Sequence, residues 1–75
     1  MISLSNASSG RIYTIAWMCL PQTTNDYENL KIEEGRTLTV AVNLSGDVIC
    51  VIEGRRIIVT KPVAERIKLV EVEDI

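Results

Sequence analysis

Short aliphatic runs between polar turns dominate the second half of the chain. Residues 37–43 alternate apolar and polar side chains. Leu38, Val40 and Val42 share one apolar face, and Asn43 lies on the other face. This period of two predicts a half-buried strand. Residues 48–53 are apolar on both faces except at their end, which is typical of a strand that is buried on both sides or curls around a core. Residues 57–60 predict a third strand, antiparallel to the second.

Two polar segments separate these strands and are short enough to be tight turns. Residues 45–47 read Ser-Gly-Asp and residues 53–56 read Glu-Gly-Arg-Arg. Gly46 and Gly54 tolerate the positive φ angles that tight turns require, and Asp47 can hydrogen-bond its own backbone. Since neither segment leaves space for a crossover helix, the three strands form an antiparallel meander.

The first half of the chain predicts one strand and one short helix. Residues 11–18 form the strand, with Tyr13 and Trp17 on one face and Met18 on the other. A break follows, and residues 26–31 predict a short helix, with acidic residues near its positive N-terminal end.

The C-terminal part predicts one or two helical turns and a last strand. Residues 60–66 suit a short helix, with Thr60 as its N-cap and Pro62 in its first turn, where no hydrogen bond is lost. Residues 67–72 alternate, but the apolar phase changes by one residue midway. Such a change predicts a β-bulge in this strand, a device that curls a sheet.

These elements indicate a mainly β fold of about five short strands with one or two short helices. An open sheet of this size would leave two unpaired edges, whereas closing it into a small barrel removes them. The 75 residues, of which 47% are hydrophobic, predict a single domain over residues 1–75.

Charge and hydropathy exclude several classes of function. The formal net charge is −2, whereas nucleic-acid binders usually carry a strongly basic face, so no nucleic-acid partner is expected. The longest apolar run, residues 15–20, is far shorter than the ~20 residues of a membrane span. Met1 to Leu4 lacks the layout of a signal peptide. We therefore expect a cytoplasmic protein that does not insert into a membrane.

The residue types that usually carry catalysis are scarce or isolated. The chain has no histidine, and Cys19 and Cys50 have no nearby partner that would activate a thiolate. Cys50 lies between two aliphatic residues and is expected to be a small buried hydrophobe. The acidic residues at 33–34 and 71–74 could attract a divalent cation, but solvated surface charge is the simpler interpretation. We expect no enzyme and no cofactor.

Two groups of residues are candidates for contact with a partner. Arg55 and Arg56 at the hairpin either carry charge into solvent or bind carboxylates of a partner protein. Trp17, Met18 and Leu20 are either part of the core or the apolar centre of a contact surface.

The spacing of several bland positions resembles the FeoA family (ferrous iron transport protein A). The resemblance spans residues 27–70 and rests on Tyr27-x-x-Leu30-x-Ile32-x-x-Gly35, Thr37-x-Thr39-Val40, Gly46-Asp47-x-Ile49-x-Val51-x-x-Gly54, Ile57-x-Val59 and Ala64-x-x-Ile67-x-Leu69. The chain departs from the family in having Lys31 where a glycine is usual, and in lacking arginines before the Tyr27 motif.

The resemblance implies an SH3-like barrel and a binding function. It implies a small cytosolic accessory protein of ferrous iron transport that docks on the cytosolic portion of the FeoB transporter and modulates it, as a monomer or weak homo-oligomer. The expected partner-binding residues are Trp17, Met18, Leu20, Tyr27, Leu30, Lys31, Arg55 and Arg56. Two alternatives stay open: a general SH3-like module that grips a peptide, and a metal-sensing domain related to the C-terminal domain of iron-dependent repressors.

Overall fold

The computed structural model describes residues 1–19 and 32–72, and every structural statement below concerns these residues. They form six strands, one 3₁₀ turn and one short α-helix, in the order β1 (Ile2–Ser3), η1 (Leu4–Asn6), β2 (Ile12–Met18), β3 (Thr37–Leu44), β4 (Asp47–Ile52), β5 (Arg55–Val59), α2 (Lys61–Ala64) and β6 (Ile67–Glu71).

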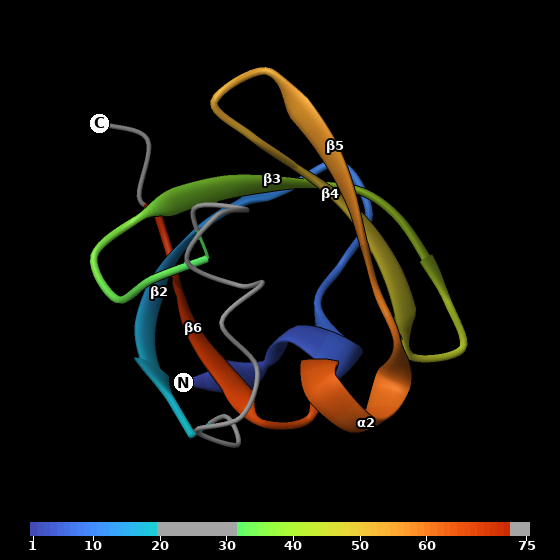
Figure 1. Ribbon diagram of the computed structural model, residues 1–75, viewed down its shortest axis with the longest axis horizontal. Coiled ribbons are helices and arrows are strands. Elements are labelled where there is room, and N and C mark those ends of the chain that lie inside the picture. The colour runs from blue at the N-terminus through green and yellow to red at the C-terminus, as the bar shows by residue number, and fades with distance from the viewer. Residues whose placement is uncertain (20–31, 73–75) are drawn as a thin grey trace.

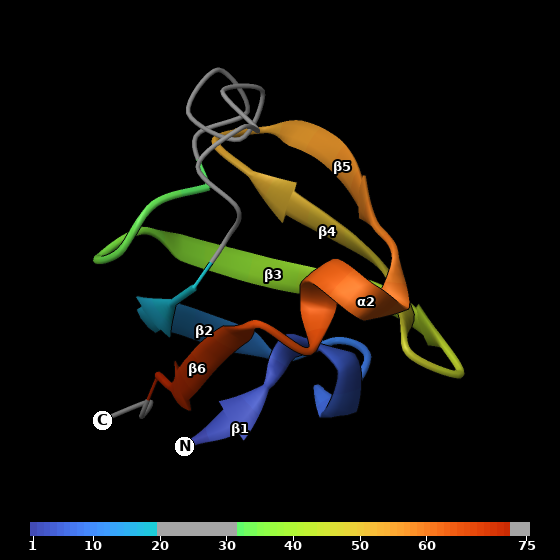
Figure 2. The ribbon, with the colours of Figure 1, turned by 60° about the horizontal axis from the view of Figure 1, so that its bottom comes forward.

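The strands form one antiparallel sheet that curls around a single core. Its strand order is β1-β6-β2-β3-β4-β5, and Figure 2 shows these strands stacked in that order. The helix α2 lies beside η1, across the core from β3 (Figure 1). The mainly β, SH3-like barrel predicted from the sequence is confirmed, and its long strands lie within two residues of the predicted ranges.

Alternate residues of each long strand line the core. In β4, Val48, Cys50 and Ile52 are fully buried, while the residues between them are half-buried. This matches the expectation of a strand that curls around a core. The other buried apolar residues come from every element except β1: Leu4, Ala7, Tyr13, Ile15, Ile32, Leu38, Val40, Ile57, Val59, Ala64, Ile67 and Leu69.

A bulge inverts the end of β2. The pairing with β6 moves from Ile15–Leu69 to Trp17–Lys68, so Ala16 is an extra residue in β2. The prediction of a bulge in the last strand is therefore wrong, because the extra residue lies in β2 and not in β6. The apolar phase change in β6 has another cause: Val70, at its exposed end, lies on the outer face of the barrel.

The same bulge corrects the predicted faces of β2. Tyr13 is buried, but Trp17, predicted on the same face as Tyr13, is half exposed. Met18, expected on the opposite face, packs against the core instead. An extra residue shifts the phase of a period-two strand by one, which moves each following side chain to the other side.

A second bulge lies in β3. The pairing with β4 moves from Val40–Cys50 to Val42–Ile49, which makes Ala41 the extra residue. The strict alternation predicted for residues 37–43 therefore ends at Val40. The prediction failed at this point because the hydrophobic pattern of Val40-Ala41-Val42 is equally compatible with a regular strand.

Asn43 is turned inward by this bulge and joins three segments. Its Nδ2 donates hydrogen bonds to the carbonyl oxygens of Ser5 and Ala7, at 3.0 and 2.8 Å. Its Oδ1 accepts a hydrogen bond from the backbone N–H of Gly46 at 2.8 Å. The side chain therefore ties the N-terminal segment to the β3–β4 turn.

Both hairpins close through two-residue turns. Leu44 pairs with Asp47, and Ile52 pairs with Arg55. The four turn residues, Ser45, Gly46, Glu53 and Gly54, all have positive φ, which is the backbone geometry that matches the twist of a two-residue hairpin. The arginine pair of residues 55–56 therefore belongs to β5 rather than to the tip of the hairpin.

The start of α2 is capped from another strand. Asp47 Oδ1 accepts a hydrogen bond from the backbone N–H of Lys61 at 2.8 Å. Thr60, the predicted cap, occupies the N-cap position but makes no side-chain capping hydrogen bond. The carboxylate of Asp47 therefore accepts from one of the free N–H groups of the helix and not from a backbone N–H of its own turn.

The N-terminal segment contributes to the core although the sequence pattern assigned it no element. Leu4 and Ala7 are buried, and Ile2 pairs with Leu69. Two strand residues and one helical turn are too short to show a hydrophobic period.

We predict that Asn43→Ala lowers the free energy of unfolding by about 2–4 kcal/mol, since it removes three hydrogen bonds of about 0.5–1.5 kcal/mol each. Urea unfolding followed by circular dichroism measures the change. Asn6→Ala is the matched control, because Asn6 is an exposed asparagine in the N-terminal segment to which Asn43 binds. A loss for Asn43→Ala no larger than that of the control would contradict the assigned role.

Candidate functional site

Several predicted contact residues lie at one end of the barrel. Met18 at the end of β2 pairs with Ile67 at the start of β6, and Thr37 at the start of β3 pairs with Thr14 of β2. The β4–β5 turn, which Ile52 and Arg55 close, lies at the same end. We call this end the Trp17 rim and define it as residues 17–19, 35–36, 53–56 and 66–67. It contains the four predicted contact residues that the structure describes, Trp17, Met18, Arg55 and Arg56.

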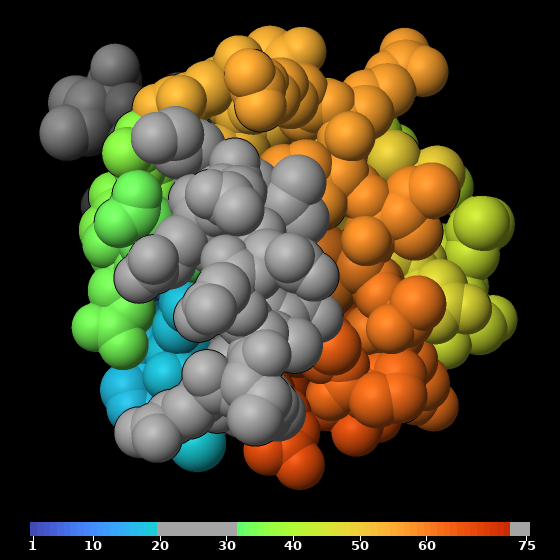
Figure 3. Space-filling model, viewed as in Figure 1, coloured from blue at the N-terminus to red at the C-terminus, as the bar shows by residue number. Residues whose placement is uncertain are grey.

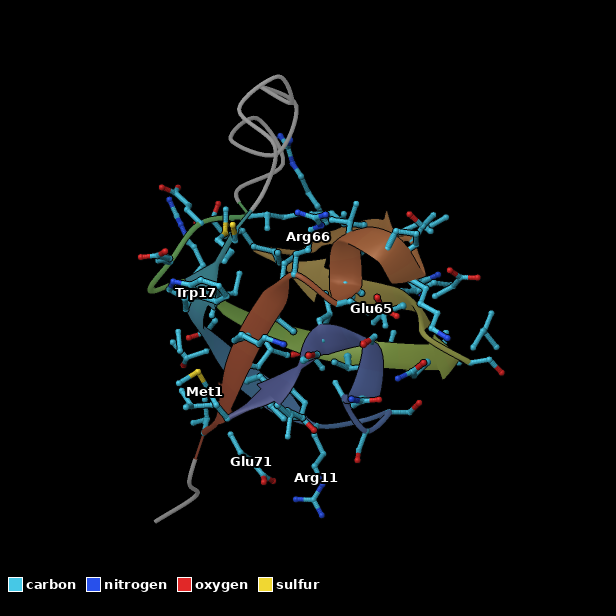
Figure 4. All side chains as sticks on the ribbon, turned by 90° about the horizontal axis from the view of Figure 1, so that it is seen from below. Met1, Arg11, Trp17, Glu65, Arg66 and Glu71 are labelled. Atoms are coloured by element: carbon cyan, nitrogen blue, oxygen red, sulfur yellow. The ribbon has the colours of Figure 1, made fainter. Side chains whose placement is uncertain are left out.

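Trp17 is the large exposed aromatic residue of this rim. It is 50% exposed, and Figure 4 shows it at the side of the molecule, pointing away from the barrel. The exposed Cys19 follows, and its backbone N–H donates a hydrogen bond to the carbonyl of Arg66 at 3.0 Å. Trp17, Cys19 and Arg66 are therefore close neighbours along the backbone at the end of β2.

An ion-pair cluster joins two turns of the rim. The guanidinium of Arg36 pairs with Glu33 at 3.0 Å and with Glu53 of the β4–β5 turn. Both carboxylates are about half exposed, so each pair contributes little to stability. The cluster links the segment of residues 33–36 to the turn that precedes Arg55.

Arg55 and Arg56 are exposed at the start of β5. Strands β3 and β4 lie between β5 and β2 in the sheet, so the arginine pair and Trp17 occupy opposite sides of the rim. Figure 3 shows the same separation, with β2 in blue and β5 in orange on opposite sides of the visible face. The sequence analysis named these residues as two groups of candidates, and the structure places them as two patches of one rim.

The remaining predicted contact residues lie outside the described part of the chain. These are Leu20, Tyr27, Leu30 and Lys31, together with the helix predicted over residues 26–31. Their role stays a prediction.

The acidic residues do not gather into a metal site within the described ranges. No group of three or more potential ligands occurs in residues 1–19 and 32–72. Glu33 pairs with Arg36, and Glu71 pairs with Arg11. Glu73 and Asp74 lie outside the description. The same ranges contain no helix long and apolar enough to span a membrane.

A polar hollow of about 710 Å³ lies at the other end of the barrel. Its lining is Ser3, Ser5, Asn6, Asn43, Ser45, Gly46, Lys61 and Glu65. The amide of Asn43 is already committed to three backbone partners. The stem of Lys61 covers Gly46, where an added Cβ would lie 2.8 Å from its Cγ and Cδ. Two of the lining side chains, Asn43 and Lys61, are therefore already in contact with other parts of the chain.

Comparison with known proteins relies on structure alone. No family model matches the chain, and no curated protein sequence matches it. A crystal structure titled iron uptake regulatory protein (FeoA) is similar with a TM-score of 0.81 at 18% identity, covering 95% of this chain and 96% of that chain. The chain has the FeoA-like fold. At this level of identity the likeness concerns the fold.

Other solved structures share the FeoA-like fold over only part of their length. The iron(II) transport protein A from Clostridium thermocellum has a TM-score of 0.80 at 19% identity, over 95% of this chain and 46% of that chain. A manganese-dependent transcriptional repressor has a TM-score of 0.81 at 20% identity, over 93% of this chain and 41% of that chain. This chain thus spans less than half of that repressor.

Cys50 has the environment of an inert core thiol. It is completely buried in β4, and its Sγ donates a hydrogen bond to the carbonyl of Ile57 at 3.7 Å. Burial raises the pKa of the Cys50 thiol from 9.0 to about 11. The native state therefore holds the proton of the Cys50 thiol more tightly than the unfolded state does. The contribution of this thiol to the free energy of unfolding falls as the pH rises above 9.

We predict that a thiol reagent at pH 8 modifies Cys19 and not Cys50 in the native FeoA-like fold. Mass spectrometry after labelling counts the modified thiols. The variant Cys19→Ser should stay unlabelled until denaturant is added, and then gain one label. Rapid native labelling of that variant would show that the β4 core opens readily and would contradict the closed barrel.

Proposed function

We propose that this protein is a FeoA-like accessory protein of ferrous iron transport that acts by binding. Its partner would be the cytosolic portion of a FeoB-type transporter, reached in the cytoplasm. The observation that supports this most is the similarity of fold: the chain and a FeoA structure superpose over 95% and 96% of their lengths with a TM-score of 0.81.

The Trp17 rim is the proposed contact surface. Tryptophan and arginine dominate the binding energy of many interfaces, because one buries a large area and the other makes bidentate hydrogen bonds to carboxylates. The half-exposed Trp17 supplies the first property. Arg55 and Arg56, exposed across the rim, supply the second. The sequence of residues 20–31, with Leu20, Tyr27, Leu30 and Lys31, adds the remaining predicted contacts.

Modulation of the transporter follows from differential affinity. A protein that binds one conformation of its partner more tightly than another shifts the partner toward the first conformation. No chemical step is needed for this. Within the described residues, the thiol whose pKa is raised by burial, Cys50, lies in the core and faces away from solvent.

We predict that Trp17→Ala raises the dissociation constant for the cytosolic portion of the transporter by about 30-fold, as for a central interface residue. Isothermal titration calorimetry measures the affinity, and the fluorescence of Trp17, the one tryptophan of the chain, reports its burial on binding. Leu44→Ala is the matched control, since Leu44 is 59% exposed at the other end of the barrel.

The thermal midpoint of Trp17→Ala should stay close to that of the wild type, because half of this side chain already contacts solvent. No binding by the wild-type protein at high micromolar concentration would contradict the proposed function. Equal affinity of Trp17→Ala and wild type would contradict the proposed surface. Reversing both arginines to glutamate should weaken binding most at low salt, because exposed charges act mainly through screened attraction.

A second candidate is a metal-sensing domain, which the likeness to a manganese-dependent repressor favours. A metal that binds only the folded state raises the thermal midpoint. Under the first proposal, we predict that Mn²⁺ or Fe²⁺ leaves the midpoint unchanged. Differential scanning fluorimetry with Mg²⁺ as the control cation measures this, and a rise specific to Mn²⁺ or Fe²⁺ would favour metal sensing.

A further inference from the structure

One edge of the sheet is long and has no neighbouring strand among the described residues. The strand order β1-β6-β2-β3-β4-β5 makes β1 and β5 the two edges. β1 has only two residues, whereas β5 has five. Figure 2 shows β5 at the opposite end of the stack from β1. Since an edge strand presents backbone donors and acceptors that no strand of the sheet uses, β5 is a template for a further strand.

The register of the β4–β5 hairpin shows which backbone groups of β5 point away from β4. Ile52 and Arg55 flank the two-residue turn, and in such a hairpin the flanking residues form a hydrogen-bonded pair. Hydrogen-bonded and non-hydrogen-bonded pairs alternate along an antiparallel ladder. Ile57 is therefore bonded to β4, whereas the N–H and C=O groups of Arg56 and Ile58 point to the outer edge.

Two further observations agree with this direction. The Sγ of Cys50 donates a hydrogen bond to the carbonyl of Ile57. This carbonyl therefore faces β4, and the carbonyl of the next residue, Ile58, faces the other way. Within residues 1–19 and 32–72, no backbone hydrogen bond outside the strand ladders involves Arg56 or Ile58. The edge thus presents two donors and two acceptors to an incoming strand.

The side chains along this edge suit a strand that is both acidic and apolar. Arg55 and Arg56 are exposed, and Glu53, the acidic residue of the adjoining turn, is already paired with Arg36. Ile58 is 73% exposed and lies on the same face of β5 as Arg56, because side chains alternate along a strand. A strand paired with β5 therefore places one side chain beside a guanidinium and another beside an exposed aliphatic residue.

β5 lacks several features that block edge strands in other proteins. Bulges, prolines and very short lengths prevent a further strand from pairing. The register of β5 with β4 is regular, and its sequence, Arg-Arg-Ile-Ile-Val, contains no proline. Its charges are all positive, so pairing of two copies of β5 would bring four guanidiniums together. This charge selects a strand that carries carboxylates over a second copy of the chain.

We propose that β5 binds an extended acidic segment of another protein as an additional antiparallel strand. The residues of the segment opposite Arg56 and Ile58 each exchange two backbone hydrogen bonds with β5. An acidic side chain opposite Arg56 pairs with its guanidinium, and an aliphatic side chain opposite Ile58 packs against it. In the antiparallel direction the segment reads aliphatic, any residue, acidic. A second acidic residue directly after these lies opposite Arg55.

This contact differs in kind from the contact proposed at the Trp17 rim. Arg55 and Arg56 belong to both surfaces, but strand pairing uses backbone groups along β5, whereas the rim contact uses side chains. The inference does not rest on the transporter proposal, because it specifies the chemistry of the segment and not the protein that carries it. A test with a peptide contains no transporter, so failure of either proposal leaves the other standing.

NMR titration of the isotope-labelled protein with the peptide acetyl-Thr-Val-Thr-Glu-Glu-Thr-amide tests the pairing residue by residue. In the unliganded protein, the amide hydrogens of Arg56 and Ile58 should exchange with solvent faster than that of Ile57, which is bonded to β4. The peptide should slow exchange at Arg56 and Ile58 and leave Ile57 unchanged. Slow exchange of both amides without peptide would overturn the inference, since the edge would then already be occupied.

N-methylation of the peptide separates strand pairing from simple attraction of charge. A methyl group on the amide of the Val or of the first Glu removes a backbone hydrogen bond to β5 and should abolish binding. A methyl group on the Thr between them, whose amide points away from β5, should leave the affinity nearly unchanged. All these peptides carry the same charge. Equal affinity of all of them, or no binding of the unmodified peptide at millimolar concentration, would overturn the inference.

Charge reversal in the protein provides a second, matched comparison. Arg56→Glu should weaken binding about tenfold, because a cross-strand attraction becomes a repulsion. A peptide with Lys in place of the first Glu should recover this affinity. Arg11→Glu changes the net charge equally at another exposed arginine and should bind the original peptide nearly as the wild type does. A loss for Arg56→Glu no larger than that for Arg11→Glu would overturn the inference.

Ile58→Pro tests the outward N–H directly. This N–H is not bonded to β4, so its removal should prevent peptide binding and leave the β4–β5 ladder intact, as for a proline on an edge strand. Circular dichroism shows whether the variant is folded. A folded Ile58→Pro variant that binds the peptide as tightly as the wild type would overturn the inference.

Discussion

The geometry of this barrel depends on two single-residue bulges, each at an alanine. In a strand, side chains alternate sides, so one extra residue inverts the side of every residue that follows. At Ala16 this inversion directs Met18 to the core and leaves Trp17 half exposed. At Ala41 it brings the amide of Asn43 to the inner side. Alanine suits both positions, because a small side chain at a bend neither clashes nor loses much buried area.

The second bulge also explains why the short N-terminal segment can be part of the fold. Seven residues cannot form an independent unit, yet Leu4 and Ala7 are buried. The inward amide of Asn43 binds the carbonyls of Ser5 and Ala7, which would otherwise be costly to remove from water. Asp47 acts in the same way on the first turn of α2. Two side chains beside one hairpin turn thus fix the two elements that close this end of the barrel.

The sequence predicted the elements that follow from a regular hydrophobic period and missed the bulges that interrupt this period. The β3–β4–β5 meander, the short helix after Thr60 and the buried Cys50 all follow from local patterns, and the structure has them. The two bulges do not follow, because the alternation around Ala41 fits a regular strand and apolar residues occupy both faces around Ala16. The exposure of Trp17 follows from a bulge and was therefore left open between core and surface.

The exposure of Trp17 also follows from the course of β2. This strand ends at the Trp17 rim, and the bulge at Ala16 lies just before that end. Before the bulge, the outward positions are Ile12 and Thr14; after it, the outward position is Trp17. Without the extra residue, Trp17 would have the inward phase of Tyr13 and would compete for the core of a domain that has little room for another indole. A single inserted alanine thus makes the indole available at the surface, where a large aromatic side chain contributes more to recognition than to folding.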